Sequence, residues 1–227
     1  MLTEDKRIRI IVGHYGSGKS EFAINYALQL RNITNDKIAL SDLDVVNVYF
    51  RSREQEKMLE SNNIHTIHSS INANALDLPA ISAEITTPIR DEKYNYIIDV
   101  GGDSIGAKVL GRFSQDIKMT DYDMLFVING NREKTQTVEE IIRYIKEIEF
   151  TSKLKVTGLI NNTHLLRETR IEDIIKGQKL ASQVSNILAI PIKYTSCIEP
   201  LVEVVKEHIE NDILPIKMYL RKQWMWK

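Results

Sequence analysis

The chain has 227 residues, of which 43% are hydrophobic, and its 30 Lys and Arg residues nearly balance its 31 Asp and Glu residues. A net charge of -1 supplies no overall field to gather nucleic acid or anionic lipid, so we expect no nucleic-acid partner. The single cysteine, Cys197, excludes an intrachain disulfide and an all-cysteine metal site.

The sequence contains no apolar run near the ~20 residues that a membrane-spanning helix requires. Its first apolar run, residues 8–12, is too short for a signal peptide and follows a polar start. We therefore expect a cytoplasmic protein. No linker or repeat divides the chain, and we expect a single domain over residues 1–227 with a helical tail from about residue 199.

Short β-branched runs alternate with longer segments of helical length, which predicts a doubly wound, mostly parallel α/β sheet flanked by helices. In chain order, we expect strands at residues 8–12, 37–40, 96–100, 124–128, 156–160 and 187–192, with a short strand at 64–67. The expected helices lie at residues 20–31, 48–61, 107–118, 135–149 and 170–184.

Residues 13–20 follow the first strand and fit the pattern G-x-x-x-x-G-K-[ST]. Such a phosphate loop wraps backbone N–H groups around phosphate oxygens, and the following helix adds its positive end. We expect Lys19 to reach the β- and γ-phosphates and to act in catalysis, and Ser20 to bind Mg²⁺. The nucleotide-binding residues of this loop are Gly13, His14, Tyr15, Gly16, Ser17, Gly18, Lys19 and Ser20.

Two later strands end in carboxylates. Asp99 closes the third long strand and is the expected second metal residue, and Gly102 in the turn after it could meet a γ-phosphate and move when that phosphate leaves. Asp103 could relay that change. Asp42 and Asp44 end the second strand; we expect Asp42 to steady the metal and Asp44 to orient the attacking water, although carboxylates at strand ends are also common surface residues.

These motifs together resemble the deviant Walker A ATPases of the MinD/ParA type, with the CobQ/CobB nucleotide-binding domains and the nitrogenase iron protein. The resemblance implies a P-loop NTPase fold, ATP and Mg²⁺ as ligands, and a homodimer that sandwiches two nucleotides. It also implies that an asparagine after the fifth long strand reads adenine, with Asn162 favoured over Asn161, and that Pro191 and the loop from Tyr194 to Ile198 flank the purine.

The sequence departs from this family at His14, where the family has a signature lysine that reaches the partner's phosphates. A neutral His14 could still donate one hydrogen bond to a phosphate, or it could be a packing residue. Arg112 and Arg132 follow strand ends on the same side of the sheet, and each is either a phosphate or partner contact or a solvated arginine.

The last residues combine basic and aromatic side chains without an acidic residue after Asp212. Ile213, Ile216, Leu220 and Trp224 would share one face of a helix. That helix could contact a membrane, as the related MinD tail does, but docking on its own domain or on a protein partner is the better interpretation.

The sequence thus predicts a Mg²⁺-dependent ATP-binding protein, a slow ATPase that switches an unknown protein client between states with ATP or ADP bound. Two alternatives remain open. The same loop could serve a small-molecule kinase or an ATP-dependent ligase, or the protein could be a nucleotide-dependent adaptor that does not hydrolyse ATP.

Overall fold

The computed structural model describes residues 2–43, 55–68 and 83–220. Its long elements alternate as the sequence predicts, because short β-branched runs fill buried strands and amphipathic segments cover them. The strands are β1 (Ile8–Gly13), β2 (Lys37–Leu43), β3 (Ile64–His68), β4 (Tyr94–Val100), β5 (Tyr122–Ile128), β6 (Gly158–Asn161), β7 (Ile192–Ile198) and β8 (Asp212–Ile216). The α-helices are α1 (Lys19–Arg31), α2 (Glu56–Ser61), α3 (Thr86–Arg90), α4 (Ser104–Arg112), α5 (Ser114–Lys118), α6 (Val138–Ser152), α7 (Ile171–Leu188) and α8 (Val202–Lys206).

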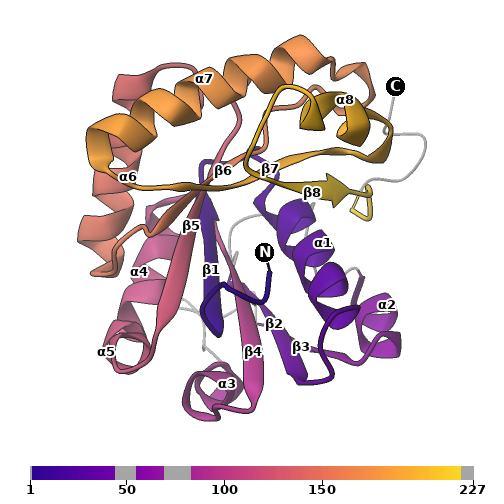
Figure 1. Cartoon of the computed structure of the whole chain (residues 1–227). Helices are drawn as coiled ribbons and strands as arrows, with labels where there is room; N and C mark the ends of the chain where they lie inside the picture. The colour runs from indigo at the N-terminus through magenta and orange to yellow at the C-terminus, as the bar shows by residue number, and fades with distance from the viewer. Residues whose placement is uncertain (1, 44–54, 69–82, 221–227) are drawn as a thin grey trace, which may run out of the picture.

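The eight strands form one sheet in the order β3-β2-β4-β1-β5-β6-β7-β8, and every pairing is parallel. Helices cover both of its faces (Figure 1). One core cluster packs α3 to α7 against the sheet, and a second packs α1 and α2 against the other face. The predicted doubly wound α/β fold is confirmed.

The order of the strands places a crevice above β1. The chain leaves β1 through α1 toward one face of the sheet, whereas it leaves β5, the neighbour of β1, through α6 toward the other face. Ligands of open α/β sheets bind at such a switch point, beyond the carboxyl ends of the strands. The glycine-rich residues 13–20 lie at this edge, directly after β1.

Two predicted elements differ in the structure, and a third is described only in part. The helix expected at residues 107–118 is divided into α4 and α5 at Phe113. Near this point Gly111 lies so close to the carbonyl oxygen of Thr151 that a Cβ atom at Gly111 would be 2.9 Å from it. The strand expected at residues 187–192 is wrong, because α7 continues to Leu188 and β7 begins only at Ile192. The part of the expected helix 48–61 before residue 55 lies outside the described residues.

The expected helical tail does contain α8, but the helix predicted to include Ile213, Ile216 and Leu220 is wrong. Asp212–Ile216 form the edge strand β8, and residues 217–220 continue along α1. Proline is tolerated in an edge strand because its missing N–H faces away from the sheet, so Pro215 does not prevent this strand. Trp224 lies outside the described residues, and none of the described helices is long and apolar enough to cross a membrane.

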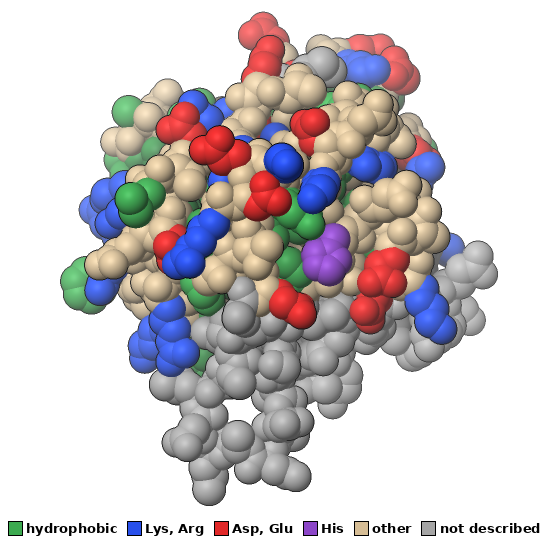
Figure 2. All heavy atoms as spheres, turned by 90° about the horizontal axis from the view of Figure 1, so that it is seen from below, with side chains coloured by type: hydrophobic (Ala, Val, Ile, Leu, Met, Phe, Trp, Pro, Cys, Tyr) green, Lys and Arg blue, Asp and Glu red, His purple; other side chains and the backbone are tan. Residues whose placement is uncertain are grey.

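One face of the molecule carries acidic and basic side chains close together over the described residues (Figure 2). This mixture agrees with the near-zero net charge of the sequence. It gives that face no extended potential of one sign.

Candidate functional site

The loop between β1 and α1 depends on glycine at three positions. Gly13, Gly16 and Gly18 have φ values of 151°, 76° and 87°, in the region that L-residues with side chains rarely adopt. The amide of Ser17 donates to the His14 carbonyl oxygen at 3.1 Å, and α1 begins immediately after Gly18. The first N–H groups of α1 have no acceptor within the helix, so this turn ends in an anion-attracting helix terminus.

The Lys19 side chain folds back over this loop. The side chain is buried at 5% exposure, and its Nζ donates to the His14 carbonyl oxygen at 3.3 Å. A Cβ atom at Gly102 would lie 2.9 Å from the same Nζ and 2.6 Å from the Tyr15 amide nitrogen. The turn after β4 therefore packs directly on the loop, and only glycine fits there.

The predicted metal-binding carboxylates also come together. Asp42 and Asp99 are register partners in β2 and β4, and both are buried. Asp99 is in turn level with Ile11, two residues before the glycine loop begins. The half-buried Ser20 lies at the start of α1 and lines the adjoining pocket. Within the described ranges, no three His, Cys, Asp or Glu side chains form a metal-binding group, and Asp44 lies outside those ranges.

A tyrosine that the sequence did not single out holds the turn after β4. The hydroxyl of Tyr144, in α6, donates to the Gly102 carbonyl oxygen at 2.7 Å. Burial, together with the charges of Glu147 and Asp103, raises the pKa of Tyr144 to about 12, so it remains a donor at neutral pH. The sequence places Tyr144 in a helix through the helical period of α6, but it gives no sign of this contact, because the partners are far away in the sequence.

His14 does not take the place that its position in the motif predicts. Its ring packs edge-on against Tyr144 with 5.4 Å between ring centroids, and it is not among the side chains that line the pocket. Its Nδ1 lies 2.9 Å from the Tyr15 carbonyl oxygen, which requires a proton on Nδ1. Burial lowers the pKa of His14, and Lys19 adds to that effect, so the ring is neutral at pH 7.

Asp103 caps the helix that follows the Gly102 turn, and its role as a relay stays a prediction. Its Oδ1 accepts the backbone N–H groups of Ile105 and Gly106 at 3.0 and 2.8 Å, which caps the amino terminus of α4. An Asp cap fixes where α4 starts and therefore where the Gly101 and Gly102 turn ends.

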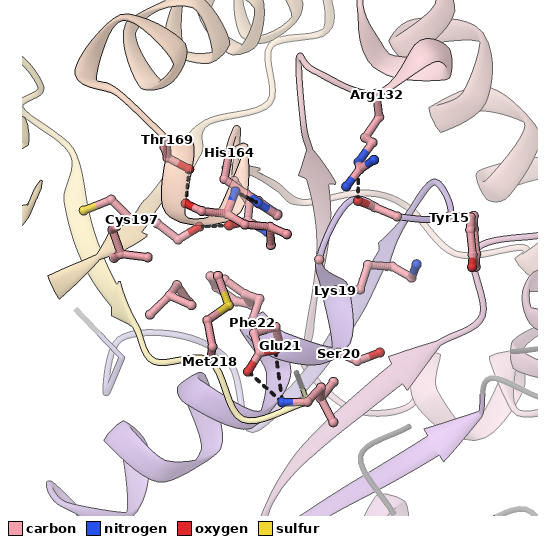
Figure 3. A pocket seen from close by; sticks show the side chains of 18 residues that line it. Tyr15, Lys19, Ser20, Glu21, Phe22, Arg132, His164, Thr169, Cys197 and Met218 are labelled. Atoms are coloured by element: carbon pink, nitrogen blue, oxygen red, sulfur yellow. Dashed lines mark hydrogen bonds between the residues drawn. The ribbon is translucent and has the colours of Figure 1, made fainter. Parts of the chain in front are cut away.

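A cavity of about 260 Å³ opens beside the loop and has two different ends. Figure 3 shows Lys19, Ser20, Arg132 and Tyr15 on one side and Cys197 and Met218 on the other. The apolar side is completed by Phe22, Ile198, Ile216 and Leu220. Such a cavity can hold a molecule with an anionic tail and a flat apolar head.

The chain after β8 forms one wall of this cavity through a ladder of contacts with α1. The side chains of Glu21, Asn25 and Gln29 follow one another at four-residue spacing on α1. They bond to the backbone of residues 215–220. Glu21 accepts the amide of Leu220 at 3.2 Å. This wall could not be predicted, because the residues were expected to form a helix.

Asn162 joins the loop to the far side of the cavity. Its Nδ2 donates to the Ser17 carbonyl oxygen at 2.7 Å, and its Oδ1 accepts the Ser196 hydroxyl at 2.7 Å. An amide has two N–H groups and two lone pairs, so one of each remains for a ligand. Asn162 lines the cavity, and its contact with a base stays a prediction.

Asn161 and Pro191 do not reach the cavity, and these two expectations are corrected. Asn161 is fully buried, and its Nδ2 uses both hydrogens on the Ile174 carbonyl oxygen and Gln178 Oε1. Pro191 precedes β7, at the edge of the parallel sheet opposite the glycine loop. The residues of this expected segment that line the cavity are Ser196, Cys197 and Ile198, at the other end of β7 and within the loop expected from Tyr194 to Ile198.

Cys197 provides a chemical reporter of this cavity, because it is the only cysteine and its side chain lines the wall. Burial raises the pKa of its thiol to about 11. At pH 8 the thiolate fraction is then roughly 200 times lower than for an unperturbed thiol of pKa about 8.5. We expect iodoacetamide to alkylate the folded protein at least 100 times more slowly than the urea-unfolded chain. Equal rates in mass-spectrometric time courses would contradict the burial of this side chain.

The fold and this site define a class. A central parallel strand, a glycine-rich turn with a lysine and serine at its end, and a helix starting there form the P-loop NTPase fold.

Solved structures share this fold. The cell division protein FtsY of Thermotoga maritima is 22% identical with a TM-score of 0.55, over 85% of this chain and 62% of that one. Chloroplast FtsY of Physcomitrella patens is 16% identical with a TM-score of 0.56, over 83% and 57%. FlhF complexed with GMPPNP and Mg²⁺ is 13% identical with a TM-score of 0.50, over 83% and 64%.

These likenesses establish the fold alone. The chain spans less than two thirds of each of these three proteins. No family model and no curated protein matches the sequence. The P-loop NTPase fold inferred from the motifs is therefore confirmed, whereas the narrower MinD/ParA class is not supported by these comparisons.

Proposed function

We propose that this chain binds ATP together with Mg²⁺ and acts as a nucleotide-dependent switch. The observation that carries the proposal is that the ends of β1, β2 and β4 lie side by side at the edge of the sheet where Lys19 begins α1. The loop after β1 supplies Lys19 itself, Gly102 in the turn after β4 packs on its Nζ, and β2 and β4 bring Asp42 and Asp99 into register with each other. A lysine in a glycine loop at a helix terminus is the arrangement that holds β- and γ-phosphates.

The residues present also suit Mg²⁺. Mg²⁺ takes oxygen ligands, keeps several waters, and needs only one or two protein groups beside the nucleotide. Ser20 would contribute a hydroxyl, and the buried pair Asp42 and Asp99 would orient the water shell. When bound, the ion would neutralise charge on the phosphates.

The switch part of the proposal rests on the turn at Gly102. Its backbone touches the phosphate loop, and Tyr144 holds its carbonyl oxygen from α6. A phosphate entering at Lys19 would meet this turn first, so its position would depend on which nucleotide is bound. Asp44 stays our prediction for the residue that orients the water in slow hydrolysis.

We expect ATP to bind more tightly than GTP because of the hydrogen-bonding groups near the apolar end of the cavity. The remaining N–H and lone pair of Asn162 match the donor and acceptor of an adenine edge. Guanine adds N1–H and N2–H donors that need a further acceptor. Among the described side chains that line the cavity, Glu21 is the one carboxylate, and a guanine would have to reach one of its acceptor sites beside the bond to the Leu220 amide.

Competition between nucleotides tests this preference. A fluorescent ATP analogue bound to the protein should be displaced by MgATP at least about ten times more effectively than by MgGTP, the factor expected for one lost hydrogen bond. The GMPPNP bound to FlhF favours the opposite outcome. Displacement by MgGTP at an equal or lower concentration would show that the protein is a GTP-binding one.

Turnover separates the remaining alternatives. A slow ATPase releases phosphate in ATP and Mg²⁺ alone, a kinase or ligase forms ADP only with its small-molecule substrate, and a pure adaptor does neither. Light scattering with ATP and with ADP tests the homodimer that the MinD/ParA resemblance implies. These measurements also decide whether a client protein should be sought with the ATP-bound or the ADP-bound form.

A further inference from the structure

Arg132 lies against the phosphate loop although the two are 116 residues apart in the sequence. Its Nε donates to the Gly16 carbonyl oxygen at 3.0 Å. Figure 3 shows the Arg132 side chain reaching from the turn after β5 to the side of the cavity that holds Lys19. Arg112, the other arginine considered in the sequence, is exposed at the end of α4 and does not line this cavity.

The backbone that carries Arg132 is fixed by Asn129, which is fully buried. The Asn129 carbonyl oxygen accepts the Arg132 amide at 2.9 Å and the Thr135 hydroxyl at 2.6 Å. Its side-chain Oδ1 accepts the amides of Asn131 and His164 at 3.1 and 3.4 Å. The turn is thereby tied to the end of β6, so Arg132 is held at the loop before any ligand arrives.

The charges in the cavity leave a place for a second cation. A nucleoside triphosphate carries about four negative charges at neutral pH, since its terminal phosphate approaches two. Mg²⁺ and Lys19 together neutralise about three of them. His14 is not among the side chains that line the cavity. Of the described side chains that line the cavity, Lys19 and Arg132 are the two with a permanent positive charge.

The guanidinium of Arg132 has donors to spare. It has five N–H groups in a planar fork, and its bond to Gly16 uses the one on Nε. The four N–H groups on the terminal nitrogens remain for an anion. Such a fork matches two phosphate oxygens at once, which a lysine cannot do.

We propose that Arg132 is a second phosphate-binding residue, which contacts the phosphate chain of the nucleotide from within the same subunit. The inference rests on the proposed function, because it requires a nucleotide at Lys19. It deepens that function by making one chain sufficient to neutralise the bound triphosphate.

The test compares Arg132→Ala, Arg132→Lys and the matched surface change Arg112→Ala in the full chain. Affinities for MgATP and for inorganic tripolyphosphate are measured by displacement of a fluorescent ATP analogue over a series of salt concentrations. We expect Arg132→Ala to weaken both by about tenfold to hundredfold, Arg132→Lys to weaken them less, and Arg112→Ala to change neither more than about twofold.

Salt dependence distinguishes a phosphate contact from support of the loop. Loss of a charge contact makes binding less sensitive to salt, whereas a distorted loop lowers affinity with an unchanged slope. An affinity within about twofold of the wild type, or a loss with the wild-type slope, would overturn the role of Arg132. If the wild-type protein itself binds neither MgATP nor the analogue, the proposed function fails as well.

Discussion

Replacing Lys19 by alanine is expected to lower the affinity for MgATP by at least about hundredfold. Its ammonium is held over the glycine loop at the His14 carbonyl oxygen and beside Gly102. A hydrogen bond to a charged group contributes about 1.5–3 kcal/mol, and Lys19 would make more than one to the phosphates. Calorimetric titration of both proteins with MgATP measures the difference.

The matched control is Lys108→Ala, which removes the same charge from an exposed position on α4 outside the cavity. This control should bind MgATP like the wild type. Lys19→Ala should also keep its thermal midpoint without nucleotide, because alanine is a good helix former at the start of α1. A Lys19→Ala protein that binds MgATP as well as Lys108→Ala would refute the assignment of residues 13–20 as the phosphate loop.

Replacing Gly18 by alanine is expected to lower the free energy of unfolding by about 2–5 kcal/mol. Its φ of 87° costs an alanine roughly 1–2 kcal/mol. In addition, the new Cβ atom would lie 2.4 Å from Asn162 Nδ2, which must then leave its buried bond to Ser17 at a cost of about 1–3 kcal/mol.

Gly16→Ala separates the two causes. Gly16 has a similar φ of 76°, but its Cβ atom would meet only the flexible Arg132 side chain, at 3.5 Å. We expect Gly16→Ala to cost about 1–2 kcal/mol from backbone strain alone. Urea unfolding of both variants measures this. Equal losses would mean that Asn162 is not packed against Gly18.

The fold could be predicted from the sequence because its signals are local. Buried parallel strands require short apolar runs, and α6 shows its helical period through Ile141, Ile145 and Ile148. The end of α7 could not be placed, since its last turn contains Ile187 and Leu188 and its C-cap is Ala189 in a left-handed conformation, where a glycine would have marked the stop.

The C-terminal segment was misassigned because two periods fit it. Ile213 and Ile216 suit one face of a helix, and the run from Ile213 to Ile216 also suits a short strand. The segment forms a strand because β7 pairs with it along one edge. Asn25 and Gln29 of α1 also form hydrogen bonds with its backbone. Neither partner is visible in the local sequence.

The candidate site, like the fold, has residues that could be predicted from the sequence and residues that could not. The glycine loop, Asp42 and Asp99 could be found because each lies at the end of a predictable strand, and the parallel register then brings the two carboxylates together. Tyr144 and the wall after β8 depend on contacts between distant segments. The position of Pro191 was wrong because the expected strand began at residue 187, five residues before β7 begins at Ile192. Pro191 was therefore expected at the carboxyl end of the strand, whereas it lies before the amino end of β7.

The most direct measurement of the central claim is calorimetric titration of the unaltered chain with ATP, with Mg²⁺ present and with Mg²⁺ removed by EDTA. We predict saturable binding of one ATP per chain in Mg²⁺, weaker binding in EDTA, and slower alkylation of Cys197 in the ATP-bound protein, because Cys197 lines the same cavity. Absence of binding at millimolar MgATP, with Cys197 alkylated at an unchanged rate, would contradict the assignment of this cavity as a nucleotide site.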